Sequence, residues 1–451
     1  MIKRQIFKAN DIRGIATGSD PEWDAEGAFA IGAALVDTLD LVSAEGALVL
    51  GRDMRVTSPE FSRAFSDGVR SRGADVIDIG LASTDQLWFA SGRLEIPGAM
   101  FTASHNPGDY NGVKFCLAHA RPIAASMLIE IADRAMNDHP LPAGAQGSLT
   151  EMDLLPAYAD HLHSLVDLSD ARRLRVVADA GNGMAGHTLP AVLGEANVDL
   201  IGLYTDLDGT FPHHAPNPLE PENLVDAQAA VLEHGADLGL VFDGDADRCF
   251  IIDERGEVVN PSVVTAMIAS QELAREPGAT IVRNTITSRS VGELVERLGG
   301  RIITTRVGHT FVKAAMAEHN AIFGGEHSAH YYFRDFWSAD TGMLAGLHVM
   351  ALVGRDRRPL SELAEEFVSY AASGEINSTV ADTDRATDAV AAAFADRTEQ
   401  DRTDGLTASA ENWWFNLRPS NTEPLLRLNV EAIDRATMES VRDEVLAIVR
   451  N

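Results

Sequence analysis

The chain has 451 residues, which is too long for one hydrophobic core and predicts roughly three or four domains. It carries 37 basic and 67 acidic residues, and this formal net charge of −30 at pH 7 repels nucleic acids and anionic lipids. We therefore expect neither nucleic acid nor a membrane as a partner.

Only four of the basic residues are lysines, so Lys114, which follows a serine-containing motif, is hard to explain as surface charge. Cys116 and Cys249 lie in apolar stretches, which favours buried thiols in a reducing compartment over a disulfide framework. The first residues, "MIKRQIFKANDIRG", contain no apolar signal core, and the chain has no run of 18 apolar residues. We expect a cytoplasmic protein that is a monomer or a weak dimer.

Short apolar runs alternate with segments of helical period, which is typical of parallel α/β units. The stretches 47–80, 174–204 and 279–309 each predict a strand, a polar loop, a helix and a second strand. Their common order of elements predicts three related α/β domains.

The pattern changes after about residue 366. An acidic segment, 379–405, has helical character, and the alternating segment 413–432 predicts two strands around a turn. A final helix is predicted from Arg435. The fold class is therefore three related α/β domains plus a smaller C-terminal α+β domain. The predicted domains are 1–148, 149–254, 255–366 and 367–451.

The segment "TASHNPGDYNGVK", residues 102–114, places Ser104 before a Pro-Gly turn. A hydrolytic serine needs a general base and an oxyanion hole. His105 is adjacent in sequence, which is a poor arrangement for a base, and no G-x-S-x-G elbow is present. We therefore favour a serine that carries a phosphoryl group and binds a metal through it.

The segment "LGLVFDGDADRCFII" places Asp243, Asp245 and Asp247 between two apolar strands. Three carboxylates at alternate positions can converge on one hard cation, and magnesium is the natural choice. A solvated acidic turn, a phosphatase with Asp243 as phosphoryl acceptor, and an EF-hand loop ending at Glu254 are the alternatives. The EF-hand reading fails at its sixth position, where Arg248 replaces the required glycine.

The segment "RPSNTEPLLRL" combines Arg418 with the polar side chains of Ser420, Asn421 and Thr422 in a turn between strands. A guanidinium, hydroxyls and free backbone N–H groups can hold a phosphate, although a plain hairpin turn has the same pattern. Arg427, on the following strand, either adds charge to this cradle or forms a salt bridge.

The segment "GGEHSAH", residues 324–330, follows an apolar strand. Glu326 and Ser328 could bind sugar hydroxyls, with His330 beside them, although a helix-capping pair is an equal alternative. His309 in "RVGHT" and Arg13 in "NDIRG" are weaker signals by themselves.

Taken in order, "FKANDIRG", "TASHNP", "DGDADR", "GEHSAH" and "RPSNTEP" resemble the motifs of the α-D-phosphohexomutase family, in its bacterial phosphomannomutase/phosphoglucomutase branch. The resemblance spans nearly the whole chain. It implies a four-domain protein with a central cleft that interconverts hexose 1-phosphates and 6-phosphates, of mannose and of glucose, through a 1,6-bisphosphate that also serves as activator.

The resemblance also implies roles for individual residues. Ser104 would be phosphorylated, and Mg²⁺ would be held by the phosphoserine and the three aspartates. Lys114, Arg248 and Arg13 would surround the transferring phosphoryl group, with Lys114 and His309 as candidate proton carriers.

Three positions depart from the family pattern: Asn10 replaces an aromatic residue, Ala329 replaces a glycine, and "STDQ" at 83–86 lacks a proline. A phosphoglucosamine mutase, a catalytically silent sugar-phosphate sensor and a calcium-binding structural protein remain as alternatives. His327 replaces the glutamine of glucosamine-specific relatives, and a protonated imidazole there would repel an ammonium group.

Overall fold

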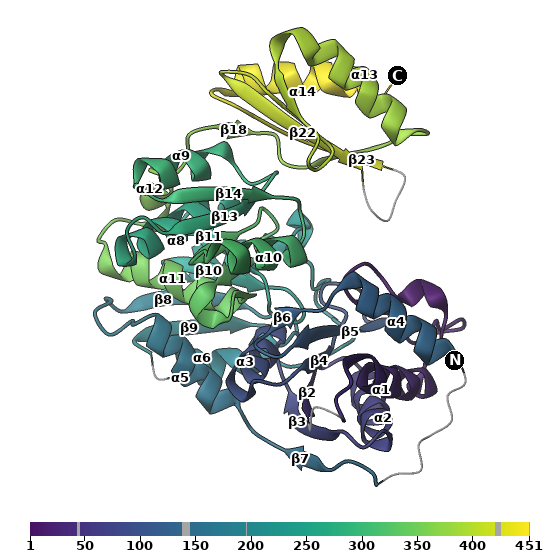
Figure 1. Cartoon of the computed structure of the whole chain (residues 1–451). Helices are drawn as coiled ribbons and strands as arrows, with labels where there is room; N and C mark the ends of the chain where they lie inside the picture. Colours follow the sequence, from purple (N-terminus) through teal and green to yellow (C-terminus); the bar gives the residue numbers. More distant parts are fainter. Residues whose placement is uncertain (43–45, 138–144, 195, 420–424, 451) are drawn as a thin grey trace. The chain divides into compact units, whose positions relative to one another are not determined.

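The structure, a computed structural model, describes residues 1–42, 46–137, 145–194, 196–419 and 425–450 (Figure 1). The chain forms two compact units. Unit 1 comprises Met1–Pro261 and Ser328–Leu363, and unit 2 comprises Ser262–His327 and Ala364–Asn451. None of the helices in the described residues is long and apolar enough to cross a membrane.

The first sheet of unit 1 has the strand order β1-β5-β4-β2-β3-β7, with β6 paired to β5. β2 runs parallel to β3 and β4, whereas β5 is antiparallel to both β4 and β1. The strands are β1 (Ile12–Ile15), β2 (Ala47–Arg52), β3 (Asp75–Leu81), β4 (Gly98–Phe101), β5 (Tyr110–Leu117), β6 (Arg121–Pro122) and β7 (Leu149–Glu151).

Four helices belong to this sheet, and they are α1 (Ala25–Leu39), α2 (Ser58–Ser71), α3 (Thr84–Leu94) and α4 (Ala125–Met136); a short 3₁₀ turn, η1 (Arg4–Ile6), precedes them. α1 and α2 lie side by side, as Figure 1 shows. The two helices approach so closely that a Cβ on Gly32 would lie 2.3 Å from the carbonyl oxygen of Phe65. Only glycine fits at this position. Trp23, Phe65 and Phe101 fill the core beneath them.

The second sheet of unit 1 has the order β12-β11-β10-β8-β9. β8 is parallel to β9 and β10, and β11 returns antiparallel to β10, so residues 243–248 form the turn between β10 and β11. The strands are β8 (Leu174–Asp179), β9 (Val198–Leu203), β10 (Leu238–Phe242), β11 (Cys249–Asp253) and β12 (Val258–Val259). Every residue of β10 and β11 is buried. Strands on both sides of the turn exclude the helix-loop-helix geometry of an EF-hand.

The remaining elements of unit 1 are α5 (Leu155–Leu165), α6 (Ala185–Leu193), η2 (Pro221–Leu224), α7 (Val225–His234), β16 (Tyr331–Phe333), η3 (Arg334–Phe336), β17 (Ala339–Asp340) and α11 (Gly342–Arg355). α7 packs against β8 and β10, and α11 packs against β11, so helices cover the buried central strands. A further helix, α12 (Leu360–Glu365), spans the end of unit 1 and the start of the second segment of unit 2.

Unit 2 contains a parallel layer in which β13 pairs with both β14 and β15. Its elements are α8 (Pro261–Arg275), β13 (Thr280–Asn284), α9 (Arg289–Arg297), β14 (Arg301–Thr305), α10 (His309–His319) and β15 (Phe323–Gly325). α9 has its apolar residues on one face, and Val291 and Val295 of that face are fully buried.

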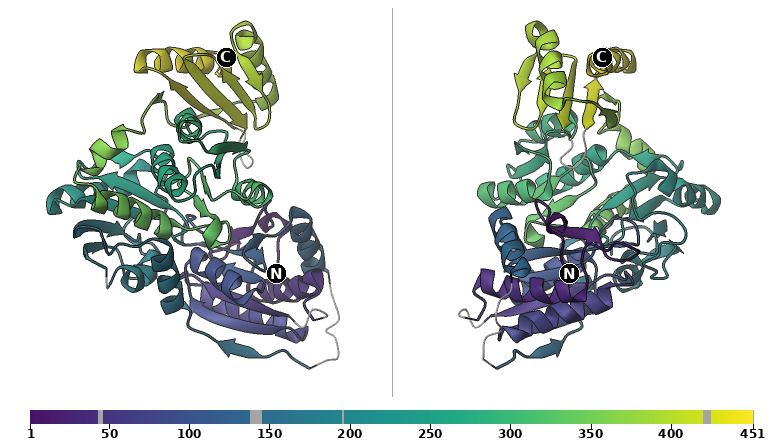
Figure 2. Two further views of the ribbon diagram at one scale, coloured as in Figure 1. Left: turned by 60° about the vertical axis from the view of Figure 1, so that its left-hand side comes forward. Right: turned by 90° about the vertical axis from the view of Figure 1, so that its right-hand side faces the viewer.

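Unit 2 also contains an antiparallel sheet of order β18-β23-β22-β21-β20, with β19 paired to β23. α13 and α14 pack against each other and share one hydrophobic core with this sheet (Figure 2). The elements are β18 (Ala371–Ala372), β19 (Ile376–Thr379), α13 (Thr383–Phe394), η4 (Ala395–Arg397), β20 (Glu399–Asp401), β21 (Leu406–Ser409), β22 (Trp413–Pro419), β23 (Leu425–Ala432) and α14 (Arg435–Val449).

The predicted elements are confirmed. The three strand-helix-strand stretches are β2-α2-β3, β8-α6-β9 and β13-α9-β14, and the C-terminal segment forms the predicted helix, strand pair and final helix. Cys116 and Cys249 are both buried, as expected. The four domain boundaries drawn from the sequence stay predictions.

Candidate active site

Ser104 lies in the loop between β4 and β5, and its backbone is in the left-handed region with φ of 49°. A residue other than glycine in this region costs on the order of 1–3 kcal/mol, and such strain is common at active sites. The Ser104 hydroxyl donates a hydrogen bond to Asp243 Oδ2 at 2.9 Å. The strained turn therefore aims a buried hydroxyl at the acidic turn of the neighbouring sheet.

The side chain of His105 lies within hydrogen-bonding distance of the Ser104 hydroxyl, although adjacent residues are a poor arrangement for a serine and its base. Its Nδ1 is 3.2 Å from Ser104 Oγ, because the left-handed turn folds the adjacent side chain back. Burial, and then the positive charge of Arg248, lower the pKa of His105 well below its usual range. The imidazole is therefore neutral at pH 7 and within hydrogen-bonding distance of the hydroxyl.

Asp243, Asp245 and Asp247 come together in the β10–β11 turn. Each is buried, and one carboxylate oxygen of each lies within 4.8 Å of the other two. Asp245 Oδ1 and Asp247 Oδ1 are buried without a hydrogen-bond partner among the described residues. Two such buried carboxylate oxygens are unfavourable unless a cation binds them, so the residues present fit a hard metal ion.

The charges of these carboxylates are unequal. Burial raises the pKa of Asp243 to about 7, which Arg248 opposes and the other two aspartates reinforce. Burial also acts on Asp245, but the charge and hydrogen bond of Lys114 outweigh it and lower the pKa of that carboxyl. Negative charge on three neighbouring buried carboxylates therefore needs nearby cations to balance it.

Lys114 and Arg248 provide part of that compensation. Lys114 Nζ donates to Asp245 Oδ2 at 2.7 Å and also contacts Asp247 Oδ2, and Arg248 Nε donates to Asp243 Oδ2 at 2.9 Å. Burial would lower the pKa of Lys114, but the charges of Asp245 and Asp247 raise it above its usual range. Lys114 is therefore an ammonium at neutral pH.

Arg13 lies on β1, next to the serine loop. Its guanidinium donates to Asn106 Oδ1 at 2.9 Å and to Asp11 Oδ2 at 2.6 Å. Arg13 thus contacts the serine loop, since Asn106 is in that loop, and its catalytic role stays a prediction.

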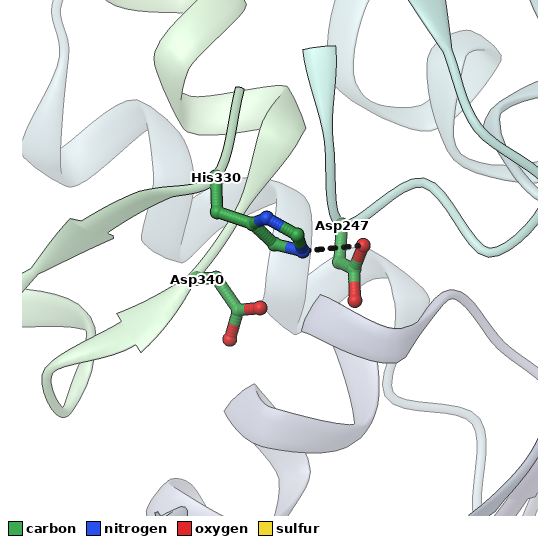
Figure 3. A group of neighbouring side chains, drawn as sticks. All are labelled: Asp247, His330 and Asp340. Carbon is green, nitrogen blue, oxygen red and sulfur yellow. Dashed lines mark ion pairs between the residues drawn. The ribbon is translucent and has the colours of Figure 1, made fainter. Parts of the chain in front are cut away.

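His330 lies beside the acidic turn and not with the sugar loop alone. Figure 3 shows its ring pointing toward Asp247, with Nε2 at 3.6 Å from Asp247 Oδ1, and its Nδ1 lies 3.0 Å from Ser328 Oγ. Asp340 faces the same group from β17. Sequence reasoning missed Asp340, because nothing in its local pattern distinguishes it from other acids.

The segment "STDQ", which lacks the proline of the family pattern, contacts the acidic turn through Thr84. Thr84 donates to Asp245 twice, from its N–H to the backbone oxygen at 2.9 Å and from Oγ1 to Oδ2 at 2.6 Å. The next residue, Asp85, is fully buried and accepts hydrogen bonds from Ser83 and, at 2.7 Å each, from Tyr158 and Thr341. Burial raises the pKa of Asp85 to about 6 against these three donors.

Unit 2 carries Glu326 and His309. Glu326 Oε2 accepts from Asn284 Nδ2 at 2.9 Å and from the backbone N–H of Gly308 at 3.2 Å. His309 follows Gly308 as the first residue of α10. The two predicted site residues are thus linked through one glycine N–H.

Arg418 and Arg427 face each other across β22 and β23 and share one carboxylate. Arg418 donates to Glu375 Oε2 at 3.1 Å, and Arg427 donates to Glu375 Oε1 at 3.2 Å. Ser420, Asn421 and Thr422 lie outside the described residues.

His327 differs from the sequence-based expectation. Its ring lies 3.4 Å from the hydroxyl of Ser262, and burial is the main cause that lowers its pKa. The imidazole is neutral at pH 7, so the repulsion of an ammonium by a protonated His327 is wrong as an argument for substrate choice.

The sequence matches models of four successive domains of the phosphoglucomutase/phosphomannomutase family. Three are described as alpha/beta/alpha domains I, II and III, over residues 4–140, 156–256 and 260–370, and the fourth as the C-terminal domain, over residues 375–448. The observed sheets agree with three α/β domains and a different fourth domain.

Known relatives match over their full length. The chain is 40% identical to a phosphomannomutase from Salmonella typhimurium, with 100% of both chains covered, and 41% identical to phosphohexose mutases from Xanthomonas campestris, with 98% and 99% covered. A crystal structure of a phosphoglucomutase/phosphomannomutase family protein from Burkholderia thailandensis superposes with a TM-score of 0.90 at 30% identity, covering 100% and 98% of the chains. This chain belongs to the phosphoglucomutase/phosphomannomutase family.

Proposed function

We propose that this protein is a phosphohexomutase that interconverts the 1-phosphates and 6-phosphates of mannose and glucose through a phosphoserine at position 104. The observation that carries the proposal is the buried Ser104 hydroxyl, held 2.9 Å from Asp243 of an acidic turn in which two buried carboxylate oxygens accept no hydrogen bond from the described residues. Family membership and the full-length relatives support the reaction class.

Asp243, Asp245, Asp247 and an oxygen of the phosphoserine would hold Mg²⁺. When bound, the ion supplies positive charge to phosphoryl oxygens and so lowers the cost of bringing them against carboxylates. Carboxylate and phosphate oxygens are the ligands that magnesium prefers. The two orphaned oxygens of the turn support this assignment.

The reaction needs two phosphoryl transfers, each of a different phosphoryl group. In the first transfer the bond between phosphorus and Ser104 Oγ breaks, a bond to the free sugar hydroxyl forms, and the hydroxyl proton leaves. In the second transfer the bond between the other phosphorus and its sugar oxygen breaks, a bond to Ser104 Oγ forms, and the serine proton leaves while the sugar oxygen gains a proton. Lys114, Arg248 and Arg13 would neutralise the group in transit, which is how phosphoryl transfer is mainly catalysed.

Each phosphoryl transfer needs one group that removes the proton of the attacking hydroxyl and one that protonates the leaving oxygen. Lys114 Nζ contacts Asp245 and Asp247 in the turn that also binds Ser104, and this position makes it the candidate acid for the serine oxygen. His309, at the start of α10, is the candidate base for the sugar hydroxyl.

The unreacted phosphate and the sugar need their own contacts. Arg418, with Ser420, Asn421, Thr422 and Arg427, would hold the phosphate that is not reacting. The substrate would have to displace Glu375 as the partner of the two guanidiniums, as a phosphate is the stronger bidentate acceptor. Sugar hydroxyls common to both orientations would bind Glu326, Ser328 and His330.

Arg418→Ala should reduce kcat/KM for 1-phosphate and 6-phosphate substrates alike, because one cradle serves both orientations. Loss of the charge-assisted fork costs about 1.5–3 kcal/mol, which corresponds to roughly a 10- to 150-fold decrease. Initial rates in both directions measure it. An effect confined to one direction would mean two separate phosphate sites.

Mannose 1-phosphate and glucose 1-phosphate should turn over within about tenfold of each other, which is about 1.4 kcal/mol in transition-state free energy. The two sugars differ only at C2, and a substrate that binds in two orientations is best held by its C3 and C4 hydroxyls. Glucosamine 1-phosphate should be clearly worse, because His327 replaces the glutamine that glucosamine-specific relatives have at this position.

One coupled assay with the three sugar phosphates tests the assignment. A preference for glucosamine 1-phosphate would favour a phosphoglucosamine mutase instead. A protein that binds these sugar phosphates but neither turns them over nor carries a phosphate on Ser104 would be a sensor, and intact-mass measurement separates that outcome from catalysis.

A further inference from the structure

Arg55 is a buried arginine in the loop between β2 and α2, and none of the roles above uses it. Its side chain is wholly inaccessible to solvent. A buried guanidinium is costly unless its donors are satisfied, so its partners indicate what it does.

The four terminal N–H groups of Arg55 all bind one loop. Nη1 donates to the carbonyl oxygens of Pro107 at 2.6 Å and Tyr110 at 3.1 Å, and Nη2 donates to those of Ser104 at 2.8 Å and Asn106 at 2.7 Å. These acceptors span the segment that joins β4 to β5 and carries the reactive serine.

The fifth N–H group of the guanidinium, on Nε, binds a buried aspartate. Nε donates to Asp53 Oδ2 at 3.1 Å, and the other oxygen of Asp53 accepts from the Ser58 hydroxyl at 2.6 Å and from the Arg55 N–H at 3.0 Å. Asp53 is fully buried. All five guanidinium N–H groups therefore have acceptors, and the ion pair is tied to the first turn of α2.

The Ser104 backbone is fixed on both sides by these contacts. Its N–H donates to Thr102 Oγ1 at 2.9 Å, and its carbonyl oxygen accepts from Arg55. A Cβ on Gly244, in the acidic turn, would lie 2.5 Å from that carbonyl oxygen. The Ser104 carbonyl is thus enclosed between Arg55 and the aspartate turn, in the left-handed conformation that aims Oγ at Asp243.

We propose that Arg55 is a positioning residue for phosphoryl transfer: it holds the serine loop in its strained conformation and places a fixed positive charge behind the phosphoserine. This inference rests on the proposed phosphorylation of Ser104. Lysine could not replace it, because an ammonium is a point charge with three donors and cannot span four carbonyl groups in a planar fork.

Arg55→Lys tests the proposal because it keeps the charge and removes the fork. We expect kcat to fall by roughly 100-fold with KM within about threefold, since a misplaced nucleophile slows the chemical step more than binding. The rate at which dephosphorylated enzyme accepts a phosphoryl group from glucose 1,6-bisphosphate, followed by intact mass, should fall by a similar factor.

Arg70→Lys is the control variant, on α2, the helix that follows Arg55 in the chain. Arg70 also donates to a backbone carbonyl, that of Gly147 at 3.0 Å, and pairs with Asp67 at 3.2 Å. Its replacement should lower the melting temperature and leave the rate of phosphoryl acceptance within about threefold of wild type.

A folded Arg55→Lys protein that accepts phosphate at the wild-type rate would overturn the proposal. If that variant does not fold, Asp53→Asn decides in the same assay, because it keeps the guanidinium and weakens its anchor. We expect acceptance about tenfold slower for Asp53→Asn, and an unchanged rate would overturn the positioning role. Wild-type enzyme that accepts no phosphate on Ser104 would instead refute the proposed function, and this inference with it.

Discussion

Replacing Ser104 with alanine should lower mutase turnover by a factor of at least about 1000 and leave the protein folded. Ser104 Oγ gives up its phosphoryl group in the first transfer and accepts another in the second, and a methyl group can form no bond to phosphorus. Because the residue acts covalently, hexose 1,6-bisphosphate supplied as activator should not restore the rate.

The fold should survive because the loop is held by its backbone. Ser104 keeps its N–H bond to Thr102 Oγ1 and its carbonyl bond to Arg55, both of which are independent of the side chain. The variant loses the hydroxyl contacts to Asp243 and to His105 Nδ1, and Asp243 retains Arg248 as a donor. We expect a cost of about 1 kcal/mol in unfolding free energy.

Turnover in the presence of hexose 1,6-bisphosphate, a thermal melt and intact mass together measure this. Ser91→Ala is the control, because Ser91 is equally buried and donates to the carbonyl oxygens of Ile96 and Leu117, outside the serine loop. It should keep both turnover and the phosphate. More than a few per cent of activity in a folded Ser104→Ala protein would contradict the covalent scheme.

The elements of the fold could be predicted because their signals are local. The stretch 47–80 contains an apolar run, a proline near the start of a helical period and a second apolar run, and it forms β2, α2 and β3. The aspartate turn was visible for the same reason, since three acids at alternate positions after a buried strand form a short pattern.

Contacts between distant residues could not be predicted in this way. Arg55 meets the Ser104 loop about fifty residues later, and Thr84 meets Asp245 across 161 positions. No spacing rule connects such pairs, because they form only when loops and helices from distant parts of the chain pack together. Burial is also invisible in the sequence, which is why His327 was expected to be protonatable and is neutral instead.

Removing the metal should abolish nearly all turnover. We expect EDTA to reduce turnover to about one per cent or less, and magnesium to restore it. Without a divalent cation the phosphoserine would face three buried carboxylates, and Lys114 and Arg248 can neutralise only part of that charge. Calcium should bind without comparable turnover, because its looser coordination positions phosphoryl oxygens poorly. Equal turnover with calcium would refute the positioning argument.

Asp245→Asn should weaken magnesium binding by at least about tenfold and kcat/KM by at least about 100-fold, because one anionic ligand is lost at constant size. Titration calorimetry with magnesium alone measures the first effect without relying on activity. Asp179→Asn is the matched control: Asp179 is equally buried at the end of β8 in the same sheet, but it binds Gly181 N–H and His214. Its replacement should leave magnesium affinity unchanged. If both variants bind magnesium like the wild type, the ion is not held by this turn, and the orphaned oxygen Asp245 Oδ1 needs another partner.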